Sequence, residues 1–172
     1  ITRGAGLVAV AVFDGVSHSS ALPANQAPGQ WLYPFGIYAR EGSALMFGFK
    51  ALQPFTDGQI NLAFFVPESG VNPEGMHCLP DMMDEPPQAQ LIWEYWDRAL
   101  WHPLNIDKDE TRAFTRSGHI YLRGPGGDIA AGRLAGIDQD LYWIRCRLEQ
   151  SSYERSPRIE MALTNTVTAT QG

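Results

Sequence analysis

The chain has 172 residues, which suits one domain and is long enough to bury a hydrophobic core without help from metals or disulfides. Its formal net charge of −6 argues against a general nucleic-acid binder, because such proteins normally present a basic face. The two cysteines, Cys78 and Cys146, form no CxxC pair, so neither a zinc site nor a disulfide framework is expected, and one bridge between them is the less favoured alternative. No apolar run reaches the roughly 18 residues of a membrane-spanning helix. Because the sequence begins at Ile1, we expect a fragment of a longer protein or a processed chain.

The N-terminal part predicts one strand followed by a linker. Residues 7–13 (LVAVAVF) are rich in β-branched side chains and end at an Asp-Gly turn signal. Residues 16–30 are rich in Ser, Ala, Pro and Gly, which is typical of a loop. We therefore expect an N-terminal strand and linker over residues 1–30 and a β-sandwich domain over residues 31–172.

Two runs with strict alternation follow. Residues 45–50 (LMFGFK) and 59–66 (QINLAFFV) each place their large apolar side chains on one face, and together they predict a hairpin of core strands. Gly48 lies on the opposite face, which indicates a bulge or a close backbone approach. Residues 67–88 hold five prolines and predict a long irregular connection, a kind of loop that is usually functional or mobile.

The second half predicts further short strands. Residues 91–96 (LIWEYW) turn back into 100–106 (LWHPLNI), where Pro103 indicates an edge strand because it cannot donate a ladder hydrogen bond. Shorter runs follow at 119–123 and 158–164. Residues 128–137, the only helix candidate, contain two glycines and are expected to be irregular.

The clearest strand is 141–148 (LYWIRCRL). Its alternation places Tyr142, Ile144, Cys146 and Leu148 on a dry face, and Trp143 with the two arginines on a wetter face. Seven or eight such strands predict an all-β fold, an antiparallel, jelly-roll-like β-sandwich with long irregular loops.

A search for catalytic patterns finds none that is specific. There is no G-x-S-x-G elbow, and the four histidines are scattered. His119 is expected to be a solvent-facing or hydrogen-bonded residue at a strand start. Paired glycosidase-type carboxylates from distant strands remain an open alternative. We expect no enzyme activity, no catalytic residue and no cofactor.

Two acidic clusters offer oxygen ligands that calcium would accept, but neither has the spacing of the twelve-residue calcium loop. A solvated loop is the favoured interpretation for both, so no metal site is expected. The clusters are Asp81, Asp84 and Glu85, and Asp107, Asp109 and Glu110.

Aromatic and arginine residues give the candidate binding sites. Trp93 and Tyr95 are expected in the core, whereas Trp96 and Trp101 flank a turn and form either a cross-strand pair or an aromatic platform for sugars. All of the candidate arginines follow residue 110, and they form either a partner-binding surface or a solvated face. The possible partner contacts are Arg145, Arg147, Arg123, Arg116 and Arg158.

Three segments in series resemble the baseplate assembly proteins of phage tails and contractile injection systems. The first is FGIYAREGSALMFGF, the second runs from WEYWD through ETRAFTRSGHI, and the third combines LYWIRCRL, PRI and NTV. The chain departs from the family pattern at Ala99, where a Gly often closes the turn, and at Ser156, where a Pro is usual. The resembling residues are 35–36, 39–40, 42, 45, 48–49, 93–97, 101, 103–104, 110–111, 114–118, 120, 141–148, 157–159 and 165–167.

The resemblance implies a structural role. Such proteins form wedges around the hub of a tail and bind neighbouring baseplate subunits. We therefore expect partners among other baseplate or tail subunits, with no nucleic acid and no membrane span, in a particle assembled in the bacterial cytoplasm. The arginine face and residues 67–88 are the expected contacts. A carbohydrate-binding β-sandwich module for surface recognition is the alternative.

Overall fold

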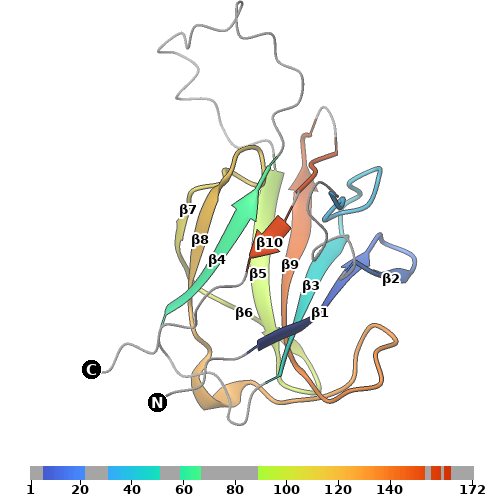
Figure 1. The fold of residues 1–172 in the computed structure, drawn as a ribbon, viewed down its shortest axis with the longest axis vertical. Helices are drawn as coiled ribbons and strands as arrows, with labels where there is room; N and C mark the ends of the chain where they lie inside the picture. Colours follow the sequence, from blue (N-terminus) through green and yellow to red (C-terminus); the bar gives the residue numbers. More distant parts are fainter. Residues whose placement is uncertain are drawn as a thin grey trace, which may run out of the picture.

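The computed structural model describes residues 6–21, 31–50, 59–66, 89–153, 156–159 and 161–163. In this part of the chain the protein is all-β, with two antiparallel sheets that pack face to face (Figure 1). The predicted β-sandwich is therefore confirmed.

The larger sheet has six strands in the order β2-β1-β3-β9-β5-β6. Figure 1 shows β2 at its outer edge, beyond β1. Its strands are β1 (Gly6–Phe13), β2 (His18–Ser20), β3 (Ala44–Lys50), β5 (Ala89–Trp96), β6 (Trp101–Pro103) and β9 (Tyr142–Ser151). The edge position predicted for the strand with Pro103 is confirmed, since β6 ends the sheet.

The smaller sheet has four strands in the order β10-β4-β8-β7. They are β4 (Gln59–Phe65), β7 (Ile106–Asp109), β8 (Gly118–Arg123) and β10 (Met161–Leu163). The connection from β8 to β9 contains one 3-10 turn, η2 (Gly126–Asp128), and a bridge between Gly132 and Leu141, so the irregular structure predicted for 128–137 is confirmed.

The main core lies between the sheets and is built on aromatic rings. Phe47 of β3 stacks on Trp93 of β5 with ring centroids 6.0 Å apart, and it meets Phe64 of β4 edge-on at 6.1 Å. All three side chains are at most 2% exposed. Truncating a buried aromatic of this kind typically costs about 3–5 kcal/mol, so these rings contribute strongly to the attachment of one sheet to the other. Cys146 is buried and free in the same core, as predicted.

The hairpin predicted from residues 45–50 and 59–66 is wrong. The first run is β3 of the six-stranded sheet, and the second is β4 of the four-stranded sheet. Both runs bury the predicted face, but these faces meet across the core instead of lying side by side. Alternation identifies the buried face of a strand and does not say which sheet the strand joins.

The N-terminal residues contribute directly to the sandwich. β1 pairs along its whole length with β3, and its Val10 and Val12 belong to the main core. Residues 16–30, expected as a loop, contain the short strand β2, which pairs with β1. The remainder of that segment, 22–30, lies outside the described residues.

A second, smaller core covers the outer face of the six-stranded sheet. Trp143 is fully buried there, and its indole nitrogen donates to the Gly132 carbonyl oxygen at 3.0 Å. The wetter environment predicted for Trp143 is therefore wrong, because the connection from β8 to β9 folds over that face. The members of this core are Ala9, Ala11, Met46, Leu141 and Trp143, with Val8, Trp96, Trp101, Leu134, Ala135 and Ile137 packed against it.

Gly48 makes the close approach that its position predicted. A methyl group at this position would lie 2.8 Å from Leu141 Cδ1 and 3.0 Å from the Trp143 ring. We predict that Gly48→Ala lowers the free energy of unfolding by about 1–3 kcal/mol, because the well-packed second core must shift. Gly127→Ala is the matched control, since a methyl group there meets nothing within 4 Å. Its effect should stay within about 0.5 kcal/mol in urea denaturation, and equal effects of the two variants would contradict the close packing.

Candidate functional site

The corner between β7 and β8 carries the central motif of the baseplate resemblance. Arg112, Ala113 and Phe114 have φ of 48°, 57° and 61°, and the amides of Thr115 and Arg116 both donate to the Thr111 carbonyl oxygen. This is a left-handed turn of three consecutive non-glycine residues, a conformation that costs roughly 1–2 kcal/mol per residue. Burial of Phe114, which is 1% exposed, offsets that cost.

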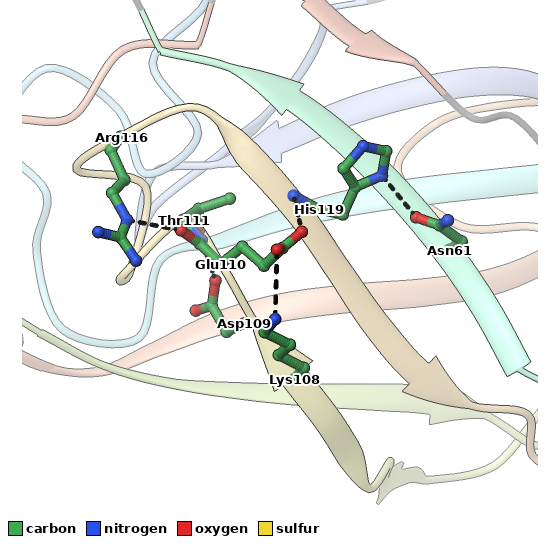
Figure 2. Close-up of polar contacts among 7 residues, drawn as sticks. All are labelled: Asn61, Lys108, Asp109, Glu110, Thr111, Arg116 and His119. Atoms are coloured by element: carbon green, nitrogen blue, oxygen red, sulfur yellow. Dashed lines mark hydrogen bonds and ion pairs between the residues drawn. The ribbon is translucent and has the colours of Figure 1, made fainter.

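Polar side chains hold this corner from both sides (Figure 2). Asp109 accepts hydrogen bonds from the amide of Thr111 at 2.7 Å and from its hydroxyl at 2.6 Å. Glu110 lies 3.4 Å from the Lys108 ammonium and accepts from the His119 amide at 3.2 Å. The Arg116 side chain turns back and donates to the Glu110 carbonyl oxygen at 2.8 Å. The contacts of Asp109, Glu110 and Arg116 with amides and a carbonyl oxygen therefore fix the local backbone.

The acidic residues of this corner do not converge on one point. Asp107 pairs with Arg123 at 3.4 Å, whereas Asp109 and Glu110 bond to the groups named above. Across the ranges that the structure covers, no three His, Cys, Asp or Glu side chains are grouped as a metal site would require. The cluster of Asp81, Asp84 and Glu85 lies outside the described residues.

His119 is the one histidine of this corner. It is exposed at the start of β8, and its Nδ1 lies 2.9 Å from Asn61 Oδ1 on β4. The predicted hydrogen-bonded histidine at a strand start is therefore confirmed.

The motif residues of the corner pack in the core or hold its backbone in place. Phe114 packs against Phe64 at 5.0 Å and Phe35 at 5.8 Å, which ties the turn to β4 and to the loop that precedes β3. The Tyr153 hydroxyl donates to the Ala113 carbonyl oxygen at 2.7 Å, and burial raises the pKa of that phenol. A methyl group on Gly118 would lie 2.8 Å from Glu110 Cβ. Packing within the chain is enough to explain why these residue types occupy these positions, and contact with another protein is not needed to explain them.

Arg145 and Arg147 form an ion cluster with a carboxylate of the same chain. Their Nε atoms lie 3.0 Å and 2.9 Å from the same oxygen of Glu94, on the neighbouring strand β5. The two arginine side chains are 21% and 29% exposed, and that of Glu94 is 10% exposed. The Arg145 guanidinium also stacks over the Trp101 ring at 4.2 Å. The charges of these two guanidinium groups are therefore already paired within the chain, which leaves them less available to a partner protein.

The five predicted arginines do not share one surface. Arg145 and Arg147 lie together on β9, but Arg123 ends β8 in the other sheet and pairs with Asp107. Arg116 bonds to the backbone of its own corner, and Arg158 stacks over Trp31 at 4.7 Å. The structure thus offers a local ion cluster and separate contacts instead of one arginine face. The other expected contact region, residues 67–88, lies outside the described residues.

Trp96 and Trp101 form the cross-strand pair that was one of the two alternatives. They are directly opposite in the β5–β6 register, with ring centroids 6.4 Å apart and planes tilted by 36°. Both rings are half-buried against the second core. The tilt and the burial leave no flat, exposed platform at this pair.

An exposed apolar cluster that the sequence analysis missed lies at the edge of the six-stranded sheet. We call it the apolar rim and define it as Val16, Tyr33, Ile37 and Tyr38, which are 78%, 37%, 69% and 76% exposed. These are four of the eight large apolar side chains exposed in the described part of the chain. They border a groove of about 470 Å³ whose floor includes Val12, Leu32 and Phe35. Contiguous exposed apolar surface of this kind marks binding sites in soluble proteins.

The core holds the apolar rim in place. Phe35 is 1% exposed and lies within the rim's own sequence, directly before the Gly36 turn. Leu32 forms a backbone bridge with Ile159, and the Ser156 hydroxyl donates to the Ile37 carbonyl oxygen. A signal was present in the sequence, since six of the eight residues 31–38 are aromatic or aliphatic and Pro34 and Gly36 interrupt the segment.

No protein-family model and no curated protein matches this sequence. The resemblance to baseplate assembly proteins therefore stays a prediction that rests on the motifs themselves. None of the helical structure within the described residues could cross a membrane.

The Glu94 cluster leads to a stability prediction. Among the residues that the structure describes, Glu94 is the one carboxylate within ion-pair distance of the half-buried Arg145 and Arg147 guanidinium groups, so Glu94→Gln should lower the free energy of unfolding by about 1–3 kcal/mol. Glu149→Gln on the neighbouring strand β9 is the control, because Glu149 is exposed, and it should change stability by less than about 0.5 kcal/mol. Similar values for both variants in urea denaturation would show that the cluster adds nothing to stability.

The turn between the two tryptophans leads to a prediction about pH. Asp97 accepts from the Leu100 and Ala99 amides and lies 2.6 Å from His102, and these contacts lower its pKa from 3.8 to about 2. Its stabilising contribution is therefore present above about pH 4 and is lost as the pH falls through about 2. Asp97→Asn keeps an acceptor oxygen and removes the charge. It should lower the thermal unfolding midpoint at neutral pH, with a difference from the parent that disappears near pH 2; a constant difference would contradict this.

Proposed function

We propose that this chain is a non-enzymatic structural component of a phage-tail-like or contractile injection baseplate, and that it binds neighbouring subunits through the apolar rim. The single observation that carries the binding role is the grouping of Val16, Tyr33, Ile37 and Tyr38 beside one groove. Tyrosine and large aliphatic side chains in contiguous patches are typical of protein interfaces. The three motif segments support the baseplate assignment.

The apolar rim has better support as an interface than the arginines of β9. Arg145 and Arg147 already share Glu94, so a partner would have to compete with an internal carboxylate. The apolar rim has no such competition, and burying it would release apolar surface from water, which is worth about 25 cal/mol per Å². We therefore place the subunit contact at the sheet edge next to β2.

The carbohydrate-binding alternative has less support. It requires exposed and roughly coplanar rings, whereas Trp96 and Trp101 are half-buried and tilted. A glycan array that shows dose-dependent binding, lost in Trp101→Ala, would favour this alternative over the baseplate proposal.

The test is whether the protein is built into a particle through the apolar rim. Contractile particles purified from the source cells should contain this protein at fixed stoichiometry, and antibody labelling in electron microscopy should place it at the baseplate end. Particles that lack the protein would contradict the proposal.

A matched pair of variants tests the surface itself. Ile37→Asp places a charge on the apolar rim, and Leu100→Asp does so at a turn far from it in the sequence; the two parent residues are 69% and 65% exposed. Ile37→Asp should reduce incorporation into particles at least about tenfold, because burying an unpaired carboxylate costs more than 1.4 kcal/mol. Leu100→Asp should incorporate normally, and equal incorporation of both variants would exclude the apolar rim as the contact.

A further inference from the structure

The groove beside the apolar rim also borders an open strand edge. β2 is the terminal strand of its sheet, and within the described residues it pairs only with β1. A terminal strand presents backbone N–H and C=O groups that can pair with another chain. Which residues present them follows from the register.

Opposite residues in an antiparallel ladder alternate between pairs that exchange backbone hydrogen bonds and pairs that do not. The Ala21 amide donates to the Val10 carbonyl oxygen at 2.7 Å, and the Asp14 amide donates to the Ser17 carbonyl oxygen at 3.2 Å. These two pairs are therefore of the hydrogen-bonded kind, and they enclose the whole of β2.

The pair Val12–Ser19 lies midway between them, two residues from each, so it is also of the hydrogen-bonded kind. The pairs Phe13–His18 and Ala11–Ser20 therefore exchange no backbone hydrogen bonds with each other. The N–H and C=O groups of His18 and Ser20 point away from β1, toward the open edge. Four backbone groups are thus directed at the position that a further strand would occupy.

Side-chain space lies next to the same edge. Ser19 and Ser20 of β2 line the groove together with Tyr33, Ile37 and Tyr38. A strand added beside β2 would therefore place alternate side chains against the apolar rim while its backbone pairs with His18 and Ser20.

We propose that this site binds an extended segment of a neighbouring subunit, which adds as a strand beside β2 and carries apolar side chains at alternate positions and one carboxylate. The inference rests on the proposed function, because it names the mode of the subunit contact and the chemistry of the partner. Backbone pairing supplies direction and register, and the groove selects the apolar residues.

Arg40 supplies the charge preference. It lines the groove, and its guanidinium stacks over the Tyr38 ring at 5.3 Å. Among the described residues no carboxylate forms an ion pair with Arg40 within 4.0 Å. The other groove charge, Asp14, bonds to the amides of Ser17 and Val16, which lower its pKa the most, and Arg40 adds a smaller lowering from a longer distance. A carboxylate on the partner segment would form a bidentate ion pair with the Arg40 guanidinium.

A second copy of this chain is the less suitable occupant. Two copies each carry a formal net charge of −6 and repel one another, which opposes edge-to-edge pairing of two β2 strands. Self-association is therefore an outcome that the experiment must detect.

The experiment uses a displayed library of random decapeptides, selected against the whole 172-residue chain. The selected peptides should alternate apolar residues and include Asp or Glu, and binding should slow amide exchange at His18 and Ser20. Ser20→Pro removes one outward donor and leaves the ladder to β1 intact, so it should weaken the selected peptide at least about tenfold. Ser152→Pro, at an exposed site after β9, is the matched control and should bind as the parent does.

A second variant keeps the proposal testable if Ser20→Pro does not fold. Arg40 is exposed, so Arg40→Gln should leave the fold unchanged. It should weaken the binding of acidic peptides several-fold and remove the salt dependence of that binding. Unchanged peptide affinity in folded Ser20→Pro, or unchanged exchange at the two amides, would overturn strand addition. A dimer in analytical ultracentrifugation that Ser20→Pro dissociates would overturn the choice of partner.

Failure of this inference can be told apart from failure of the proposed function. If Ile37→Asp blocks particle incorporation while Ser20→Pro has no effect, the apolar rim is an interface without strand addition, and only this inference falls. If neither variant affects incorporation, both fall.

Discussion

The fold depends on aromatic contacts that join the two sheets. Phe47 and Trp93 come from the six-stranded sheet, and Phe64 comes from the four-stranded sheet. Phe64 also meets Phe114, so the same contact extends to the left-handed corner between β7 and β8. The two sheets share no strand-to-strand hydrogen bonds among the described pairings, so buried side chains alone hold the smaller sheet against the larger one, and these rings are among the largest of them.

The same contacts position the proposed interface. Phe114 packs on Phe35, and Phe35 stacks on Tyr153, so the segment that carries the apolar rim is anchored by a buried ring. Ile37 and Tyr38 follow only two and three residues later and are exposed. A rigid attachment of this kind lowers the entropic cost of binding, since the exposed side chains are already presented together.

Sequence reasoning succeeded where the signal was local. The alternation in β3, β4 and β9 gave the correct inward faces, and the tryptophans on either side of a short turn proved to be opposite one another. Reasoning failed where the outcome depends on distant residues. The alternation of β3 and β4 could not say that they join different sheets, and Trp143 is buried by a connection whose own sequence gave no strand or helix period.

The candidate site shows the same division. Glu94 was not singled out, because its link to Arg145 and Arg147 spans 51 and 53 residues and needs the β5–β9 pairing to become visible. The apolar rim combines Val16 with residues 33–38, which only the fold brings to one groove. The most direct test of the account is a cryo-electron microscopy map of the assembled particle. We predict that residues 33–38 and the outer edge of β2 contact a neighbouring subunit there; a map in which both face solvent would contradict the account.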